Sequence, residues 1–426
     1  MRNWYNRIDW PSLFAWAALV ALGVAAIWSS THGPAREFLL DSVKDNANKQ
    51  MMWAGISAFV MGVIFLMRAR LLLTLAPLAY VGCLGLLVAA LVFGKEINGA
   101  KSWLQFGGAS LQVAELAKVG TVLAVAAFLS RRDVRSVQPG FNAGYLFALA
   151  GLAILVAVPM VLVVMQNDTG TGLVFAAMGY FVLFWSGLVS LPIVGLGAAA
   201  GVAVYLAIVN PVYLAIYAAL ATAGYLLWTR SKMLTALAFA ATAVVGGAAR
   251  FFLFGLLQPH QRGRLTAFVN PEEYAAAEGY HVIQSKAAIG SGGVFGKGFT
   301  NGTQTQLAYI PEQSTDFVYT IIGEELGFLG TAGILILFAF LILRLVNLGV
   351  STGSAAPRLF IAGVTGIFLT HLLINVGMTI GLMPVIGIPL PFVSYGGSAL
   401  LANTTMLAIA LTLYARHDEC GVYRAE

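Results

Sequence analysis

Long apolar stretches separated by short polar links make up most of the chain. About twelve of them have the roughly 17–25 apolar residues that a helix needs to cross a bilayer. They cover residues 12–30, 51–67, 71–93, 115–130, 143–165, 172–189, 192–209, 211–228, 233–257, 317–343, 359–382 and 398–414. Only Asn210 and Pro211 separate two of these stretches, and proline there indicates a tight turn. The pattern predicts an all-α polytopic membrane protein, with residues 1–426 forming a single integral membrane domain.

Composition agrees with this fold class. Hydrophobic residues make up 59% of the chain and charged residues only 10%, whereas a soluble domain has about 25% charged residues. The formal net charge of +6 suits an anionic phospholipid surface. Nucleic acid is excluded as a partner, because no run of Lys and Arg is interleaved with aromatic residues. Cys83 and Cys420 have no metal-ligand spacing.

The distribution of Lys and Arg predicts the orientation of the chain. With the N-terminus in the cytoplasm, the short inside links are the basic ones, as the positive-inside rule requires. Their basic residues are Arg68, Arg70, Arg131, Arg132, Arg135, Arg230, Lys232, Arg344, Arg358, Arg416 and Arg424. An even number of spans then puts both termini in the cytoplasm and makes residues 258–316 a large extracytoplasmic loop.

This loop is rich in glycine and polar residues, and it ends at Asp316, just before the predicted span 317–343. Polar loops of this size between spans are uncommon as simple connectors. We therefore expect the loop to hold the active site, with Asp316 over a cavity at the bilayer surface. Glu324 and Glu325 follow by eight and nine residues, so that Asp316 and Glu324 could share one helix face. The alternative is that one of these glutamates pairs structurally.

Within the loop, the segment GSGGVFGKG is not a phosphate loop of the Walker type, because Ser291 and Gly298 break that pattern. We interpret it as a flexible, backbone-exposing loop. Its N–H groups, together with the ammonium groups of Lys286 and Lys297, could receive a diphosphate. Upstream, Arg262 and Arg264 add guanidinium groups suited to phosphate, and we expect them to contact the substrate together with these lysines.

Ionisable groups inside the predicted spans are expensive and suggest function. Glu115 and Lys118 are three residues apart and can neutralise each other on one helix face. They form either a structural ion pair or a charged cavity wall, which Asp168 could complete by pairing with Lys118. His371 lies in the middle of a span, where a helix–helix hydrogen bond is the more common role for a histidine than catalysis.

Two further features bear on the site. Trp103 lies in an outside segment, where it is either an aromatic anchor at the interface or, with the neighbouring Lys101, part of a substrate-contact loop. No metal-binding motif is present, and His260 and His281 lack companion ligands. No metal site made only of protein ligands is expected, although magnesium or manganese could bind loosely at a diphosphate.

Five blocks in order along the chain are similar to one known family. They are NGAKSW with VAELAK, QNDTGTG, QRGRLTAFVNPEEY with GYHVIQSKAAIGSGGVFGKGF, IPEQSTDFVYTIIGEELGFLG, and GIPLPFVSYGGSALLAN. The chain resembles the SEDS family (shape, elongation, division, sporulation) of bacterial cell-wall proteins over essentially its whole length. The segment GTQTQL, just before the fourth block, resembles the RodA-type (elongation) branch of the family. Because the usual family core has ten spans, the segment near 192–232 is expected to be an inserted helical hairpin.

The resemblance implies a peptidoglycan glycosyltransferase in the bacterial plasma (inner) membrane. Such enzymes polymerise lipid II into glycan strands outside the membrane during elongation and rod-shape maintenance. They work with a class B penicillin-binding protein and other elongation-complex membrane proteins. The family's essential aspartate maps onto Asp316, its loop tryptophan onto Trp103, its cavity pair onto Glu115 and Lys118, and a further aspartate onto Asp168.

In the chemistry expected for this class, Asp316 is the base for an inverting transfer. Arg262, Arg264, Lys286 and Lys297 stabilise the departing diphosphate. Two readings of other classes remain open from the residues alone. One is a flippase for the lipid-linked precursor, which would need charges distributed through the spans. The other is a non-catalytic scaffold for the cell-wall synthesis machinery, which leaves Asp316 unexplained.

Overall fold

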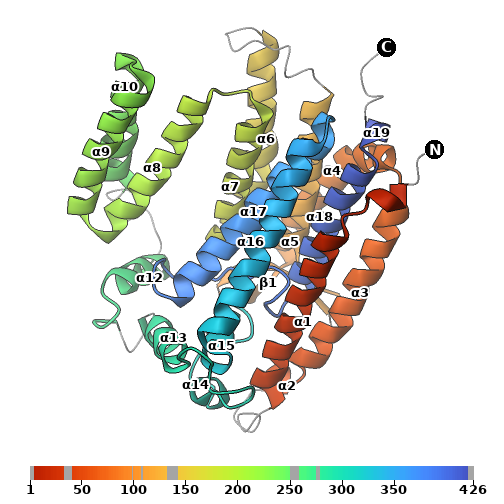
Figure 1. Cartoon of the computed structure of the whole chain (residues 1–426), viewed down its shortest axis with the longest axis vertical. Coiled ribbons are helices and arrows are strands. Elements are labelled where there is room, and N and C mark those ends of the chain that lie inside the picture. The colour runs from red at the N-terminus through yellow and green to blue at the C-terminus, as the bar shows by residue number, and fades with distance from the viewer. Residues whose placement is uncertain are drawn as a thin grey trace. The chain divides into compact units, whose positions relative to one another are not determined.

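The computed structural model describes residues 4–32, 41–97, 99–106, 109–131, 143–249, 259–274 and 279–420 (Figure 1). Among these residues, 12 helices are long and apolar enough to cross a membrane, which confirms the predicted number. The chain divides into two compact units. The first comprises residues 1–186, 284–382 and 386–426, and the second comprises residues 187–283 and 383–385. Each unit is described by itself.

The first unit carries most of the spans. It begins with η1 (Trp4–Arg7), α1 (Trp10–His32), α2 (Asp41–Lys44), α3 (Asn46–Leu66), α4 (Ala69–Phe93), α5 (Val113–Ser130), α6 (Ala143–Met165) and α7 (Thr169–Ser186). It continues with most of α13 (Gly279–Ser291), then α14 (Thr303–Gln306), α15 (Val318–Glu325), α16 (Gly327–Ser351), α17 (Ala355–Thr379), α18 (Gly397–Ala415) and α19 (His417–Cys420).

Three helices form the centre of this unit. In α17 and α18, 83% of the most apolar window is buried, and in α5 the share is 78%, whereas no other span exceeds 44%. α17 packs against α5, α7, α16 and α18, and α18 also packs against α3 and α5 (Figure 1). The peripheral spans keep an apolar outer face, because lipid replaces the protein core as their surroundings. Polar side chains on α5 and α17 are therefore enclosed by protein.

The second unit contains the predicted hairpin. α8 (Leu191–Val209) and α9 (Pro211–Thr229) are separate helices that pack side by side (Figure 1). Asn210 separates them, and its Oδ1 accepts a hydrogen bond of 2.8 Å from the N–H of Val212, which caps α9. A third span, Lys232–Ala249, consists of α10 (Lys232–Phe239), the π-helical turn η3 (Ala240–Val244) and a last helical segment. The unit also holds α12 (Pro259–Val269), which contacts α8.

A small antiparallel sheet lies in the segment between α4 and α5, where the sequence predicts only an outside loop. Its strands, in the order β1-β2-β3, are β1 (Lys95–Ile97), β2 (Ala100–Phe106) and β3 (Ala109–Gln112). Gly99, with a φ of +82°, supplies the left-handed backbone that a tight hairpin between β1 and β2 requires. Because these strands are short and pair only locally, the all-α class stands with this one addition.

The predicted span 317–343 is wrong in its bounds. α15 ends at Glu325, and α16, the actual span, begins at Gly327 with a φ of +65°. The glycine-rich loop 291–298 closes the break: the N–H groups of Lys297 and Gly298 donate to the carbonyls of Glu324 and Glu325, both at 3.0 Å. A continuous helix is therefore replaced by two, because a distant loop satisfies the backbone groups that the break exposes.

The predicted orientation and one predicted span rest partly on residues outside the described ones. Arg132, Arg135 and Arg424, which support the predicted orientation, are among the positions that are not described. The predicted span 233–257 is described as far as Ala249.

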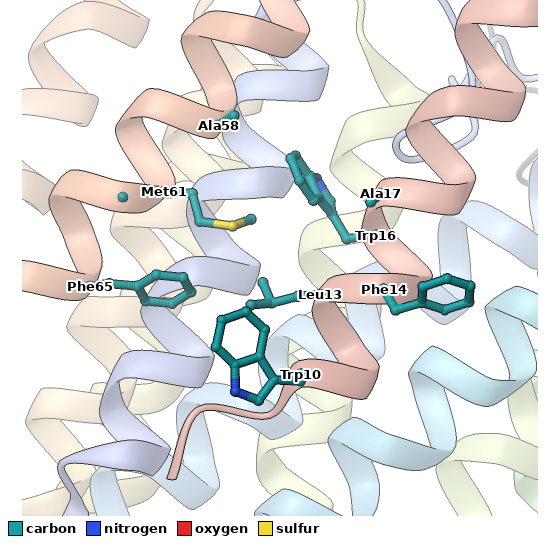
Figure 2. Close-up of a pocket in the computed structure, with 9 residues that line it drawn as sticks. Trp10, Leu13, Phe14, Trp16, Ala17, Ala58, Met61 and Phe65 are labelled. Carbon is teal, nitrogen blue, oxygen red and sulfur yellow. The ribbon is translucent and has the colours of Figure 1, made fainter. Parts of the chain in front are cut away.

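An open apolar pocket of about 540 Å³ lies between α1 and α3 (Figure 2). Its lining residues are Trp10, Leu13, Phe14, Trp16, Ala17, Ala58, Met61, Gly62 and Phe65. None of these side chains titrates, so the pocket offers no acid or base for chemistry. It has the character of a surface that membrane hydrocarbon covers.

Candidate active site

Asp316 lies in a tight turn immediately before α15. The N–H groups of Thr315, Asp316 and Phe317 all donate to the carbonyl of Glu312, at 3.2, 3.1 and 3.3 Å. The side chain of Asp316 is half-buried, and its backbone carbonyl accepts a hydrogen bond of 2.9 Å from Nδ2 of Asn375 on α17. Asp316 thus stands at the helix start and not on the helix, and it does not share a helix face with Glu324 as the sequence suggested.

The carboxylate of Asp316 lies against the segment that joins α17 and α18. A Cβ added to Gly387 would lie 3.2 Å from Oδ2 of Asp316. Gly387 also has a φ of +76°, which glycine adopts without the steric cost that other residues pay. The segment at Gly387 therefore lies against the Asp316 carboxylate, and glycine is needed at this contact.

Replacing Gly387 with alanine should displace the Asp316 carboxylate by a few tenths of an ångström and lower the glycosyltransferase activity that the resemblance implies by about 10-fold, since a misplacement of about 1 Å can cost about 10²-fold. The measurement is the rate of glycan-strand formation from lipid II. Gly187→Ala is the matched control, because Gly187 has a φ of +71° and open space around its Cα, so it bears the backbone strain alone. Equal rates for the two variants would contradict the contact.

Glu324 anchors the polar loop. Its Oε1 accepts hydrogen bonds from Nζ of Lys297 (2.8 Å), Oγ1 of Thr303 (3.1 Å) and the N–H of Gln304 (2.8 Å). Its Oε2 accepts from the N–H and Oγ1 of Thr305, both at 2.8 Å. Burial alone would raise the pKa of Glu324, but these donors hold the pKa below its usual value. A carboxylate with five donors is a poor general base.

The loop itself differs from its predicted role. Lys297, expected to receive a diphosphate, is paired with Glu324, and the N–H groups of Lys297 and Gly298 are taken up by the break between α15 and α16. The prediction that this loop offers free backbone N–H groups to a ligand is therefore wrong at these positions. Lys286 lies on α13 and is exposed, so its side chain remains accessible to a ligand from solvent.

Glu324→Gln should destabilise the protein by about 1–3 kcal/mol at neutral pH, because charge-assisted bonds become weaker neutral ones. Since the folded-state pKa is lowered, the stabilisation from Glu324 is complete above its usual value of 4.5 and is lost as the pH falls through the lower folded-state value. Thermal unfolding in detergent at several pH values measures this. The variant should lose that part of the acid sensitivity.

Glu273→Gln is the matched control, since Glu273 is exposed and accepts only one described side-chain hydrogen bond, of 3.2 Å from Asn270. A Glu324→Gln protein as stable as this control at pH 7 would show that the anchor contributes little.

Glu325 points the other way, toward α1. Its Oε1 accepts hydrogen bonds from Oγ of Ser29 (2.6 Å) and, more weakly, from Nε2 of Gln306 (3.4 Å). Burial raises the pKa of Glu325 above its usual value. Neither glutamate lies free in a cavity, so both carry structural contacts, which is the alternative that the sequence left open.

The predicted pair Glu115 and Lys118 is present and completely enclosed. Nζ of Lys118 donates to Oε1 of Glu115 at 2.9 Å, and their side chains are 1% and 0% exposed. The same ammonium lies 2.9 Å from Nε2 of His371, whose Nδ1 lies 2.8 Å from the carbonyl of Pro389. A carbonyl only accepts, so Nδ1 carries the proton and Nε2 accepts from Lys118. His371 therefore forms a hydrogen bond between α17 and α5, which is the role that the sequence favours over catalysis.

Asp168 does not pair with Lys118, so that prediction is wrong. Its Oδ1 accepts from the N–H of Thr171 at 2.9 Å and its Oδ2 from Oγ1 of the same residue at 2.9 Å, which caps the start of α7. Nε2 of Gln112 also donates to Oδ2, at 3.3 Å. A local cap competes well with a distant partner, because it needs no rearrangement of helices.

The small sheet is hydrogen-bonded to the segment that contains Asp168. The N–H of Lys101 donates to the carbonyl of Gln166 at 3.0 Å, so β2 is tied to the loop between α6 and α7. Trp103 on β2 lies opposite Lys95 and Gln112 and is partly exposed. Lys101 and Trp103 are thus linked, through Gln166 and Gln112, to the residues around Asp168. Arg262 and Arg264 lie on α12 in the second unit, and their roles stay predictions.

Sequence reasoning missed Asn375 and Gly387. The signal for Asn375 was available: His371, Asn375 and Thr379 recur every four residues, which puts three polar side chains on one face of an apolar helix. Gly387 gave no such signal among the chain's 47 glycines. Among the described residues, no group of three or more His, Cys, Asp or Glu side chains could hold a metal ion.

These features define a class: a multi-pass membrane protein whose enclosed helices support a half-buried carboxylate beside polar loops. The sequence pattern of the family described as cell cycle protein (FtsW, RodA, SpoVE) matches residues 10–221 and 212–419. The chain therefore belongs to the SEDS family. The pattern of this family is named after its members FtsW, RodA and SpoVE.

Relatives and solved structures agree with this membership. The chain is 35% identical to the peptidoglycan glycosyltransferase MrdB of Escherichia coli strain K12 over 340 residues, 80% of this chain and 77% of that protein. It is 31% identical to the peptidoglycan glycosyltransferase RodA of Treponema pallidum over 447 residues, 96% of this chain and 98% of that one.

Among structures, a chain of a peptidoglycan synthase complex that coordinates polymerization and crosslinking matches with a TM-score of 0.70 and 26% identity. The match covers 97% of this chain and 98% of that one. The rod shape determining protein RodA of Thermus thermophilus matches with a TM-score of 0.60 and 26% identity, covering 96% of each chain.

Proposed function

We propose that this protein is a peptidoglycan glycosyltransferase that polymerises lipid II into glycan strands during cell elongation and rod-shape maintenance. Relatives that match most of the chain carry the name peptidoglycan glycosyltransferase. One structural observation supports Asp316 as the active-site residue. Asp316 is half-buried in a fixed turn, and its carboxylate faces Gly387. A base in such a reaction must be held within hydrogen-bond reach of the attacking hydroxyl.

In the proposed reaction, a hydroxyl oxygen of the acceptor sugar forms a bond to the anomeric carbon of the donor sugar. The bond from that carbon to the diphosphate oxygen breaks, and the lipid diphosphate leaves with the electron pair. The carboxylate of Asp316 takes the hydroxyl proton. A single displacement of this kind inverts the anomeric configuration, and it needs no strong acid if the charge of the diphosphate is stabilised.

Within the first unit, the cation proposed to stabilise the leaving diphosphate is Lys286. For Arg262 and Arg264, on α12 of the second unit, the same role stays a prediction from the sequence. We leave Lys297 out of this set, because its charge is already balanced by Glu324 at 2.8 Å. A magnesium or manganese ion could add to them. The diphosphate oxygens would have to supply most of its ligands, since the described residues offer no cluster of three metal-binding side chains. Adding a chelator to the polymerisation reaction tests this point.

The proposed setting is the bacterial plasma (inner) membrane, with residues 258–316 and the site on the extracytoplasmic side. The proposed partner is a class B penicillin-binding protein, with which other elongation-complex membrane proteins would assemble. The likeness to a chain of a peptidoglycan synthase complex supports the first of these partners. The outward orientation is supported by the basic inside links such as Arg68 and Arg70.

The test is polymerisation of lipid II by the protein purified together with its class B penicillin-binding protein, with glycan strands detected on a gel. Strands from wild type support the proposal. If the wild-type complex makes none, and the protein instead moves a fluorescent lipid-linked precursor across vesicles, the flippase reading replaces it. The enclosure of Glu115 and Lys118 argues against that reading, because a neutralised buried pair lines no path.

A further inference from the structure

One face of α17 carries a stripe of polar side chains. His371, Asn375 and Thr379 are spaced by four residues, so they project from the same side of the helix. All three are at most 1% exposed in the centre of the first unit. Buried polar groups in a membrane helix are costly unless they are satisfied. The hydroxyl of Thr379 is satisfied within α17, where it donates to the carbonyl of Val376 at 2.8 Å, so His371 and Asn375 are the side chains that take partners on other elements.

The side chains of His371 and Asn375, and the backbone carbonyl of Thr379, contact other segments near the site. His371 bridges Lys118 on α5 to the carbonyl of Pro389. Nδ2 of Asn375 donates to the carbonyl of Asp316 at 2.9 Å and to that of Ile388 at 2.8 Å. At the end of the stripe, the carbonyl of Thr379 accepts from Oγ of Ser285 on α13 at 2.7 Å.

The amide of Asn375 is the centre of this arrangement. It has two hydrogens on Nδ2, and each meets a carbonyl oxygen from a different chain segment. The two acceptors fix the orientation of the amide, because its oxygen would repel them in the opposite orientation. Asn375 thereby joins the turn that carries Asp316 to the segment whose Gly387 faces the Asp316 carboxylate.

We infer that Asn375 is a positioning residue for Asp316: its amide clamps the aspartate turn to the 386–390 segment and so fixes where the carboxylate can accept a proton. The inference rests on the proposed function. His371 supports the clamp from the other side, since it fastens Pro389, the neighbour of Ile388, to the buried Lys118. A buried carbonyl that loses its donor seeks another partner, so removing the amide frees both segments to move.

The experiment compares Asn375→Ala, Asn375→Ser and wild type, each purified with the class B penicillin-binding protein. We expect kcat for lipid II polymerisation to fall about 100-fold in Asn375→Ala, as a misplacement of about 1 Å can produce. Asn375→Ser keeps one hydroxyl donor and should lose about 10-fold. KM should change less than about 3-fold in both, because Asn375 acts through Asp316 and not on the substrate.

A second measurement separates positioning from general loosening of the fold. Hydrogen–deuterium exchange should rise in peptides that cover residues 312–317 and 386–396, and stay unchanged in α5 and α18. The control is Asn403→Ala, which removes an equally buried asparagine from α18, where its amide has no partner among the described residues. Asn403→Ala should keep kcat within about 2-fold of wild type.

The outcomes distinguish this inference from the proposed function. If wild type makes strands and both Asn375 variants match its kcat, the inference is overturned and the proposed function stands. If exchange rises throughout the bundle, or the Asn403→Ala protein loses as much kcat, Asn375 is a general packing residue and the inference is again overturned. If wild type makes no strands, the proposed function fails, and local exchange at 312–317 still decides whether the clamp exists.

Discussion

Replacing Asp316 with asparagine should abolish lipid II polymerisation while the protein is still made, inserted and folded. Asparagine has the same shape but cannot accept the proton of the attacking hydroxyl. General-base catalysis contributes about 10²–10⁴-fold, so the rate should fall at least about 100-fold. The fold should persist, since Asn375 and the turn residues contact the backbone of Asp316, and the N–H of Asp316 still reaches the carbonyl of Glu312.

The measurement is strand formation by the complex with the class B penicillin-binding protein, together with thermal unfolding. Glu312→Gln is the matched control, because Glu312 is an exposed carboxylate four residues earlier in the same turn. It should polymerise within about 3-fold of wild type. An Asp316→Asn protein that polymerises as fast as this control would remove Asp316 from the role of base. Glu324 would be a poor replacement, since five donors already occupy its carboxylate.

Breaking the buried pair on α5 should have the second large effect. Lys118→Met keeps most of the side-chain length and removes the charge, which leaves the carboxylate of Glu115 enclosed at 1% exposure without its cation. Removing one partner of a buried ion pair costs about 3–5 kcal/mol. We expect a lower Tm and a lower yield of folded protein in detergent. Lys95→Met, at an exposed lysine of β1, should leave both unchanged.

The double variant Glu115→Leu with Lys118→Met then separates the two readings of the pair. Replacing both charges with apolar groups of similar volume is often neutral for stability, so the Tm should recover. If the pair is structural, polymerisation recovers with the Tm. If it forms a cavity wall that the substrate needs, polymerisation stays low in a stable protein. A Lys118→Met protein with the Tm of wild type would contradict the energetic argument itself.

Much of the fold could be predicted because hydrophobicity is a local property. A run of about 20 apolar residues must cross the bilayer as a helix whatever surrounds it, since its backbone has no other partners there. This reasoning gave 12 spans, and even the division at Asn210 is correct. The helix break at Leu326 does not follow from local hydrophobicity. The carbonyls of Glu324 and Glu325 at this break are satisfied by N–H groups from a loop about 30 residues earlier in the chain.

The candidate site also has features that follow from local spacing and features that depend on tertiary contacts. The position of Asp316 at the start of a helix and the i,i+3 pair of Glu115 and Lys118 follow from spacing along the chain, and both are present. The pairing of Asp168 with Lys118 failed, because the choice between a nearby threonine and a distant ammonium depends on where the helices meet. The sequence likewise predicts a diphosphate ligand for Lys297, but in the structure its ammonium pairs with Glu324, which lies 27 residues further along the chain.

By itself, then, the sequence determined the membrane fold, the number of spans and the aspartate at the end of a polar loop, because each depends on residues close together in the chain. Only the tertiary structure decided which polar groups satisfy one another. His371 meets Lys118 across 253 residues, and Glu325 meets Ser29 across 296. Within an enclosed bundle a buried polar group takes the partner that packing brings to it, and packing is set by the whole chain.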